Sequence, residues 1–267
     1  MSRRRLWLAV LVVLAVVGGV AAAATRGGGP SSSVPDDDPP GWRLVFADDF
    51  DRAELGPDWG PYQGSPGGDP YSHWEPSHVE LADGVLRLRG YEEDGRWVTG
   101  GVANYTVAQT YGRWEVRFRA DASDEVTYHL LLWPHDESWP PEIDFAEDFG
   151  GARESISAFV HYLTGGERHR VQRDLPEAAD FTSWRTVGVE WTPEEIRFLL
   201  DGAVWATVTR DELDGALPDV PMHLALQSQA GGCQRKAEWG FGDCPIAGIP
   251  DRADVEIDWV AVYEPAP

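Results

Sequence analysis

The sequence predicts an all-β fold, a two-sheet antiparallel β-sandwich. Three observations predict it: polar and apolar residues alternate with a period of two in several segments, tight-turn residues separate these segments, and helical signals are almost absent. Many short strands with turns between them are typical of a sandwich or a barrel. The length of 267 residues suits one large all-β domain or two small ones.

The N-terminal 24 residues have the parts of a secretory signal peptide. Arg3, Arg4 and Arg5 precede an unbroken apolar run that ends in alanines at Ala24. A run of this length can also cross a bilayer, so an uncleaved N-terminal membrane anchor is the alternative. The arginines also resemble a twin-arginine export signal, and the export route stays open. In either case we expect the protein to be secreted or anchored to the outer face of the cytoplasmic membrane.

Residues 25–40 (TRGGGPSSSVPDDDPP) predict a disordered linker, because glycine, serine, proline and aspartate cannot form an apolar core. The folded domain then runs from 41 to 267. The whole chain has 45 acidic residues against 22 basic ones, which gives a net charge of −23. Such a surface repels polyanions, which excludes nucleic acids as partners. We expect a monomer.

The clearest strand is 113–120, where Trp114, Val116 and Phe118 share one face and charged residues occupy the other. Asp201-Gly202 between two apolar runs is a strong hairpin signal. One helix is predicted over 209–217 by a capping-box pattern. Further strands are predicted at 85–89, 126–133, 155–162, 186–191, 196–200, 203–208, 222–227 and 255–263.

The two cysteines of the chain, Cys233 and Cys244, lie eleven positions apart in a segment rich in glycine and aromatic residues. In an exported protein they are expected to form a disulfide that closes a local loop. A zinc site is not expected, because the second pair of ligands is missing.

Three acids stand close together in Trp139–Glu147 (WPPEIDFAE). On a regular strand Glu142 and Asp144 share a face while Glu147 points away, but one β-bulge between Asp144 and Glu147 would bring all three to the same side. Two carboxyl groups about 5–5.5 Å apart are what a retaining glycosidase requires. A third carboxyl between them can bond to the nucleophile and help to retain a proton on its neighbour.

The surroundings of the acids strengthen this interpretation. The spacing E-x-D-x-x-E alone is weak in so acidic a chain. Here the acids alternate with apolar residues as in a strand, and Trp133 and Trp139 flank them. Aromatic faces are suited to stacking on sugar rings. The pattern therefore points to polysaccharide chemistry.

The segment resembles the catalytic strand of glycoside hydrolase family 16, E-[hydrophobic]-D-x-x-E, and four further motifs agree in order over nearly all of 41–267. They are 41–51 (GWRLVFADDFD), 100–102 with 111–115 (GGV and YGRWE), 186–193 with the hairpin at 201–202, and 256–263 (EIDWVAVY). The resemblance implies a concanavalin A-like β-jelly roll with a groove that binds polysaccharide.

Carried over by position, Glu142 would be the nucleophile, Asp144 the assisting acid and Glu147 the acid/base. Trp139 would be a sugar platform near the cleavage point, and His161 would reach into the cleft. The chemistry implied needs no cofactor.

The resemblance also implies other binding residues. Asp49 and Asp258 match positions that help to hold a structural calcium ion in many relatives, and hard oxygen ligands suit Ca²⁺. The run 222–229 departs from a more apolar strand of the family, and its Gln227 and Gln229, two positions apart, are expected to face the groove and hydrogen-bond to sugar. Thr127 and Leu131 depart from the family, because two tryptophans stand there in relatives that cut β-1,3-glucan.

The first hypothesis is therefore an exported, retaining, endo-acting β-glycosidase on a neutral polysaccharide, a β-1,3- or β-1,3-1,4-glucan. If sugar replaces water as the acceptor, the same site is a transglycosylase, and the sequence does not separate these two. A non-catalytic glycan-binding module on the same sandwich is the third hypothesis, although it predicts the loss of one or more of the acids, all of which are present.

Overall fold

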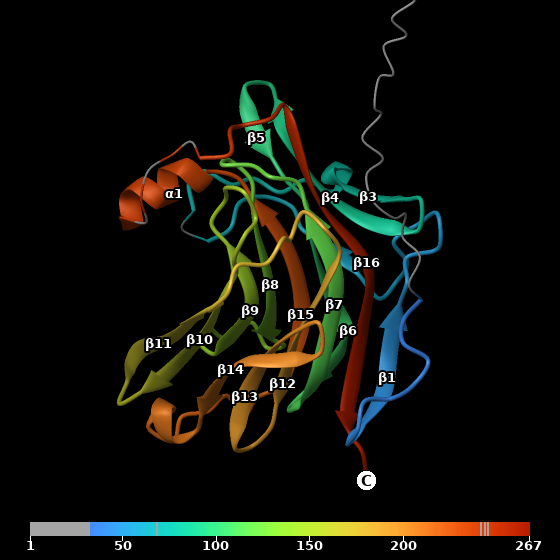
Figure 1. Ribbon diagram of the computed structural model, residues 1–267, viewed down its shortest axis with the longest axis vertical. Helices are drawn as coiled ribbons and strands as arrows, with labels where there is room; N and C mark the ends of the chain where they lie inside the picture. The colour runs from blue at the N-terminus through green and yellow to red at the C-terminus, as the bar shows by residue number, and fades with distance from the viewer. Residues whose placement is uncertain (1–32, 68, 241, 243, 245) are drawn as a thin grey trace, which may run out of the picture.

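The computed structural model describes residues 33–67, 69–240, 242, 244 and 246–267 (Figure 1). The predicted signal peptide or anchor, 1–24, and residues 25–32 of the predicted linker lie outside the described residues. No helix within the described part of the chain is long and apolar enough to span a membrane.

Two antiparallel sheets make up the domain, which confirms the predicted sandwich. The first sheet has the order β14 (Ala203–Thr209), β13 (Glu195–Leu200), β12 (Arg185–Trp191), β7 (Gly112–Ala120), β16 (Arg252–Pro265), β4 (Val85–Glu93) and β3 (Val79–Ala82), with β1 (Trp42–Asp48) on β16 and β5 (Arg96–Val98) on β4. The second sheet has the order β11 (Glu167–Asp174), β10 (Ser157–Thr164), β9 (Glu142–Asp148), β8 (Thr127–Pro134), β15 (Met222–Gln229), β6 (Gly101–Gln109) and β2 (Gly60–Pro61).

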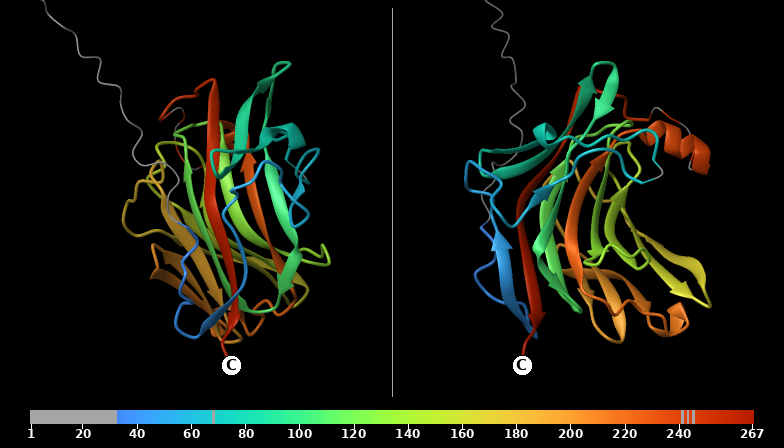
Figure 2. Two further views of the ribbon diagram at one scale, coloured as in Figure 1. Left: turned by 90° about the vertical axis from the view of Figure 1, so that its right-hand side faces the viewer. Right: turned by 180° about the vertical axis from the view of Figure 1, so that it is seen from behind.

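The hydrophobic core lies between the sheets. Trp114 and Phe118 from β7 and Trp191 from β12 are fully buried there, and they meet side chains such as Leu130 from β8 and Ile143 from β9. Because successive side chains of a strand point to opposite faces, the other residues of β8 and β9 face away from the core. The second sheet thus has one apolar face and one face free for function. Figure 2 shows this sheet curving, with α1 (Gly232–Trp239) near one end and the β10–β11 hairpin at the other.

Each of the strands predicted from the sequence is present, with small differences at the ends. The predicted helix over 209–217 is wrong: this segment holds only a 3-10 turn, η2 (Asp211–Leu213). Glu212 does bind the backbone N–H of Thr209 at 2.9 Å, as a capping box would. The turn ends because Asp214 takes the left-handed conformation, φ 53°, and Gly215 follows it. Elsewhere Pro76–His78 forms a second 3-10 turn, η1.

The chain enters the first sheet one residue after the predicted domain boundary, at Trp42. The last part of the predicted linker lies against the domain: Val34 packs on a small apolar cluster that includes Trp259, and Asp38 accepts a hydrogen bond from the backbone N–H of Leu44 at 3.0 Å.

Candidate active site

The three acids lie on β9, in the middle of the second sheet. Leu130 and Leu131 of β8 pair with Ala146 and Asp144, so Phe145 is an extra residue in the ladder. The structure therefore has the β-bulge that the sequence requires between Asp144 and Glu147. Ile143, Phe145 and Ala146 point into the core, which leaves the three carboxyl groups on the opposite face. The row of acids thus rests on a rigid, fully paired strand.

Glu142 is held by the indole of Trp139, whose Nε1–H donates to Oε2 at 2.7 Å. Burial, together with the negative charge of Glu147, raises the pKa of Glu142 from its ordinary value to about 7. The Trp139 bond works in the opposite direction, because it stabilises the charged form. Glu142 is therefore poised to ionise near neutral pH.

Asp144 is fully buried beside Glu142. Burial raises its pKa well above the ordinary value, and the charges of Glu142 and Glu147 act in the same sense. Among the described residues neither of its oxygens has a well-aligned hydrogen bond, and Nε2 of His161 lies 3.5 Å from Oδ2. A buried carboxyl in this position retains a proton and can give it to Glu142 as a hydrogen bond. Such a proton is compatible with the assisting role that the sequence predicts for Asp144.

Glu147 contacts a residue that the sequence reasoning missed. His129 stands directly opposite it on β8, and Nδ1 of the imidazole lies 2.5 Å from Oε1. The available signal was the alternation within 126–133, which puts His129 on the same strand face as Thr127 and Leu131.

A groove of about 570 Å³ opens beside Glu142. It includes four of the residues that the sequence nominated for sugar binding: Trp133, Trp139, Gln227 and Gln229. The amide of Gln229 donates to that of Gln227 at 3.1 Å, so the two side chains lie together. Further groove residues that were missed are Tyr62, Ser65, Pro66, Gly67, Trp74, Tyr105, Glu137 and His223.

The glycine pair in the 100–102 motif has a physical role next to this groove. A Cβ on Gly101 would lie 2.6 Å from a ring carbon of Tyr62, and one on Gly100 would lie 2.5 Å from the carbonyl oxygen of His78. Glycines here let the segment that carries Tyr62 pack tightly on β6, where Tyr62 lies 4.9 Å from Trp74 between ring centroids. The motif therefore supports the aromatic wall of the groove.

A second hollow, of about 310 Å³, lies on the other side of the acid row. Glu147 borders it together with Phe149, Lys236 and Ile246. Glu142 thus faces one hollow and Glu147 the other, so a chain-like ligand could cross the row of acids and extend on both sides.

His161 from β10 reaches the site, as expected. Its ring lies 5.8 Å from that of Trp139, and burial lowers its pKa, so the neutral form is favoured. Two arginines of β11 line the same end: Arg168 sits 4.7 Å over the Trp139 ring and Arg170 lies directly opposite His161. Arg168 thus covers part of the Trp139 ring, and Trp139 as a whole is 37 % exposed.

The two departures from the family pattern both face the groove side of β8. Thr127 is buried, and its hydroxyl oxygen lies 3.1 Å from Nε2 of His129. Leu131 pairs with Asp144 and is 2 % exposed. The positions of two expected tryptophans are thus taken by a hydroxyl and an aliphatic side chain under the catalytic row.

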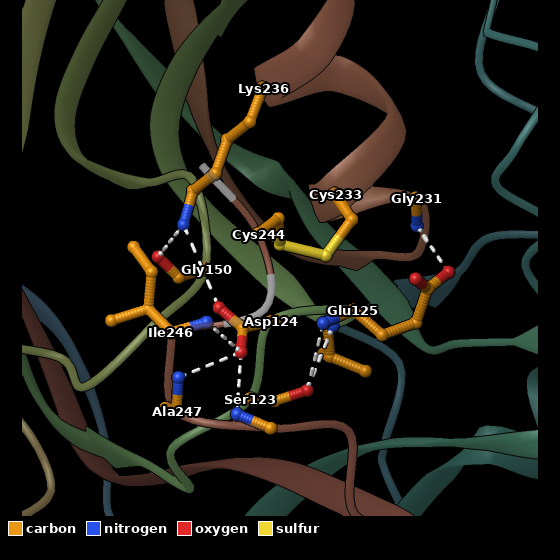
Figure 3. Close-up of a disulfide and its surroundings, with 12 residues drawn as sticks. Ser123, Asp124, Glu125, Gly150, Gly231, Cys233, Lys236, Cys244, Ile246 and Ala247 are labelled. Atoms are coloured by element: carbon orange, nitrogen blue, oxygen red, sulfur yellow. Dashed lines mark hydrogen bonds and ion pairs between the residues drawn. A yellow bond between two sulfur atoms is a disulfide. The ribbon is translucent and has the colours of Figure 1, made fainter. Parts of the chain in front are cut away.

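Cys233 and Cys244 form the predicted disulfide, with their Cα atoms 5.5 Å apart (Figure 3). The bond ties α1 to the loop that follows it. The same loop is held by the buried Asp124, whose Oδ2 accepts the backbone N–H groups of Ile246 and Ala247, each at 2.7 Å. Figure 3 shows Lys236 of α1 reaching Gly150, whose carbonyl oxygen it binds at 2.7 Å. The disulfide therefore fixes a helix that borders the active site.

The residues nominated for calcium do not form a suitable site. Asp49 is exposed and accepts a bond from the backbone N–H of Asp51, whereas Asp258 is buried and accepts one from Nε of Arg117 at 2.8 Å. A guanidinium is the wrong neighbour for a divalent cation. Ligand atoms of Glu142, Asp144 and His161 lie within 4.8 Å of one another. We assign this cluster to proton transfer, because a carboxyl that retains its proton is a poor metal ligand.

The acid row on a bulged strand can now be set beside known proteins. The model of glycosyl hydrolases family 16 matches residues 68–261. The chain belongs to glycosyl hydrolases family 16. The catalytic domain of an endo-1,3-beta-glucanase (laminarinase) from Thermotoga petrophila shares the fold at a TM-score of 0.70 and 21 % identity, over 85 % of this chain and 99 % of that one.

Two curated relatives are similar in sequence to this family 16 member. A beta-glucanase of Rhodothermus marinus is 27 % identical, over 84 % of this chain and 86 % of the relative. The endo-1,3-1,4-beta-glycanase ExsH of Rhizobium meliloti is 30 % identical over 66 % of this chain, but the match covers only 34 % of ExsH. The chain thus corresponds to about one third of that longer relative.

Proposed function

We propose that this family 16 member is an exported, retaining endo-β-glycosidase that hydrolyses a neutral β-glucan with 1,3 or mixed 1,3-1,4 linkages. The observation that carries the proposal is the bulged β9 strand, which puts Glu142, Asp144 and Glu147 on one face, with a groove beside Glu142 and a second hollow beside Glu147.

The reaction would take place in two steps. The carboxyl of Glu147 gives its proton to the glycosidic oxygen, while the carboxylate of Glu142 attacks the anomeric carbon and the bond to the leaving sugar breaks. Water then gives a proton to Glu147 and attacks the same carbon, which releases Glu142 and a sugar of unchanged anomeric configuration. Asp144 keeps a proton between the steps, and its hydrogen bond to Glu142 favours the departure of that carboxylate.

The groove supports an uncharged, chain-like substrate. Aromatic rings and the amides of Gln227 and Gln229 line one side of the acid row, and hollows on both sides allow cleavage within a chain rather than at its end. The curated relatives are named as enzymes of 1,3-1,4-beta-glycan and beta-glucan. These names support a glucan in preference to other polysaccharides.

Export is proposed on the sequence of residues 1–24. N-terminal sequencing of the protein recovered from the medium and from washed membranes tests it. A mature protein that begins after Ala24 supports cleavage, and an intact N-terminus in the membrane fraction supports an anchor. Retention of the whole product in the cytoplasm would contradict both.

The activity is tested by reducing-sugar release from laminarin, mixed-linkage β-glucan and a neutral galactan, with analysis of the products. We expect release of oligosaccharides from a glucan, and loss of turnover with retained glucan binding in Glu142→Gln. Glu194→Gln, an exposed acid in the turn between β12 and β13 on the other sheet, is the matched control and should keep full activity. Products longer than the substrate would indicate transglycosylation, and binding without any turnover would indicate a glycan-binding module.

A further inference from the structure

The contact between His129 and Glu147 belongs to a longer series of hydrogen bonds that the catalytic roles leave unexplained. The two residues are direct partners across β8 and β9, and His129 is only 7 % exposed. Nδ1 of His129 lies 2.5 Å from Oε1 of Glu147, so it contacts one of the two carboxyl oxygens of the proposed acid/base. A group in this position affects which oxygen of Glu147 is available for the substrate.

The donor and acceptor of each hydrogen bond in this series can be assigned from its end at Arg235. Nη1 of Arg235 lies 3.3 Å from the hydroxyl oxygen of Thr127, and a guanidinium can only donate. The Thr127 hydroxyl therefore accepts that bond and directs its own hydrogen to an acceptor. Nε2 of His129 is nearer, at 3.1 Å, than the backbone carbonyl oxygen of Gln229, at 3.3 Å. An acceptor Nε2 places the proton of the neutral imidazole on Nδ1, which then donates to Glu147.

Arg235 is a fixed starting point for this series. It is 5 % exposed, and its Nη2 donates to Oγ of Ser72 at 2.8 Å and to Oε1 of Gln229 at 3.0 Å, in addition to an ion pair with Asp69. It lies on α1, two residues after Cys233, so the disulfide holds the same helix in place. The charged groups that face the series are thus Arg235 with Asp69 at one end and Glu147 at the other.

We propose that His129 is a positioning residue for the acid/base, held by Thr127 and Arg235 as the Nδ1–H tautomer. It keeps Oε1 of Glu147 as a hydrogen-bond acceptor, so that the catalytic proton resides on Oε2. In the first step Oε2 gives this proton to the leaving oxygen, and the bond from His129 stabilises the carboxylate that forms. In the second step Oε2 takes a proton from water. His129 itself neither gains nor loses a proton over the cycle.

The proposal rests on the proposed function for its kinetic test. Aryl β-glycosides of a glucan disaccharide, with leaving groups from dinitrophenol to unactivated phenols, separate acid catalysis from other effects, because a good leaving group departs without a proton. For His129→Ala we expect kcat/KM to fall roughly 10- to 100-fold on the unactivated substrate, a part of what general acids contribute, and to change little on the dinitrophenyl one. Equal losses on both would show a merely structural role and overturn the proposal.

Conservative variants provide the matched controls. His129→Asn places an amide N–H near the position of Nδ1 and should recover much of the lost rate on the unactivated substrate. Thr127→Val removes the hydroxyl and should reproduce part of the His129→Ala defect, whereas Thr127→Ser keeps the hydroxyl and should behave like the wild type. Melting curves of all four variants check that they fold.

A second readout does not need activity. The ¹⁵N shifts of the His129 ring in the wild-type protein, assigned by their loss in His129→Asn, should show a protonated Nδ1 and an unprotonated Nε2. A proton on Nε2 instead would overturn the proposal. If the wild type cleaves none of the glycosides, the proposed function fails, while the tautomer still decides whether Thr127 and Arg235 orient His129.

Discussion

Replacing Glu142 by glutamine should stabilise the protein, and only above pH 4.5. Burial and the charge of Glu147 raise the Glu142 pKa from 4.5 to about 7. When folding raises the pKa of a carboxyl, its ionisation costs no free energy of unfolding below the unfolded pKa. This loss of stability grows as the pH rises and is complete above the folded pKa. A rise of this size corresponds to about 3 kcal/mol at about 1.4 kcal/mol per unit. Because glutamine keeps an oxygen acceptor for Trp139, Glu142→Gln should recover about 2–3 kcal/mol at pH 8.

Thermal denaturation at pH 4, 6 and 8 measures this gain. At about 2–4 °C per kcal/mol for a domain of this size, the Tm of Glu142→Gln should exceed that of the wild type by about 4–12 °C at pH 8 and by little at pH 4. Glu194→Gln removes the same charge from an exposed turn of the other sheet and should show no such gain in Tm at pH 8. A lower Tm of Glu142→Gln at pH 8, or a gain that is equal at all three pH values, would refute the reasoning.

Three further predictions follow from the same contacts. First, the pH profile of kcat/KM on glucan should have its acidic limb near pH 7, because the proposed nucleophile Glu142 must be ionised, and a profile with no acidic limb between pH 5 and 8 would contradict that role. Second, Trp139→Phe removes the hydrogen bond that favours the charged form of Glu142, so the acidic limb of this profile should move to higher pH; a limb that stays in place would show that the bond is unimportant. Third, changing both Cys233 and Cys244 to serine should lower the stability by roughly 2–3 kcal/mol, seen as a lower denaturant midpoint, and an unchanged midpoint would show that Asp124 alone fixes the loop.

The strands and the acid row could be predicted because both depend on local patterns. Alternation sets which residues of 113–120 enter the core, and the spacing of Glu142, Asp144 and Glu147 requires a bulge if all three are to share a face. The disulfide was predictable because the chain has two cysteines, which allow one pairing, and because its N-terminal sequence predicts export.

The support of the site could not be predicted, because it comes from contacts between distant parts of the chain. Arg235 meets Thr127 across 108 positions and Asp69 across 166, on a helix whose sequence has no strong apolar face. The predicted helix over 209–217 was wrong for a different, local reason: its capping pattern was real, but Asp214 and Gly215 ended the turn. The calcium site was expected only because Asp49 and Asp258 match family positions. The contact of Arg117 with Asp258 could not be seen in the sequence.

Covalent trapping of the nucleophile tests the central claim most directly. A fluorosugar or epoxyalkyl glycoside of a glucan oligosaccharide is incubated with the protein, and the labelled peptide is sequenced by mass spectrometry. We predict one adduct per chain, on Glu142. Because opening of the epoxide requires acid assistance, the epoxyalkyl glycoside should label Glu142 more slowly when Glu147 is replaced by alanine. A label on Glu147 or Asp144, or turnover by the wild type with inversion and no adduct, would contradict the assignment of these residues.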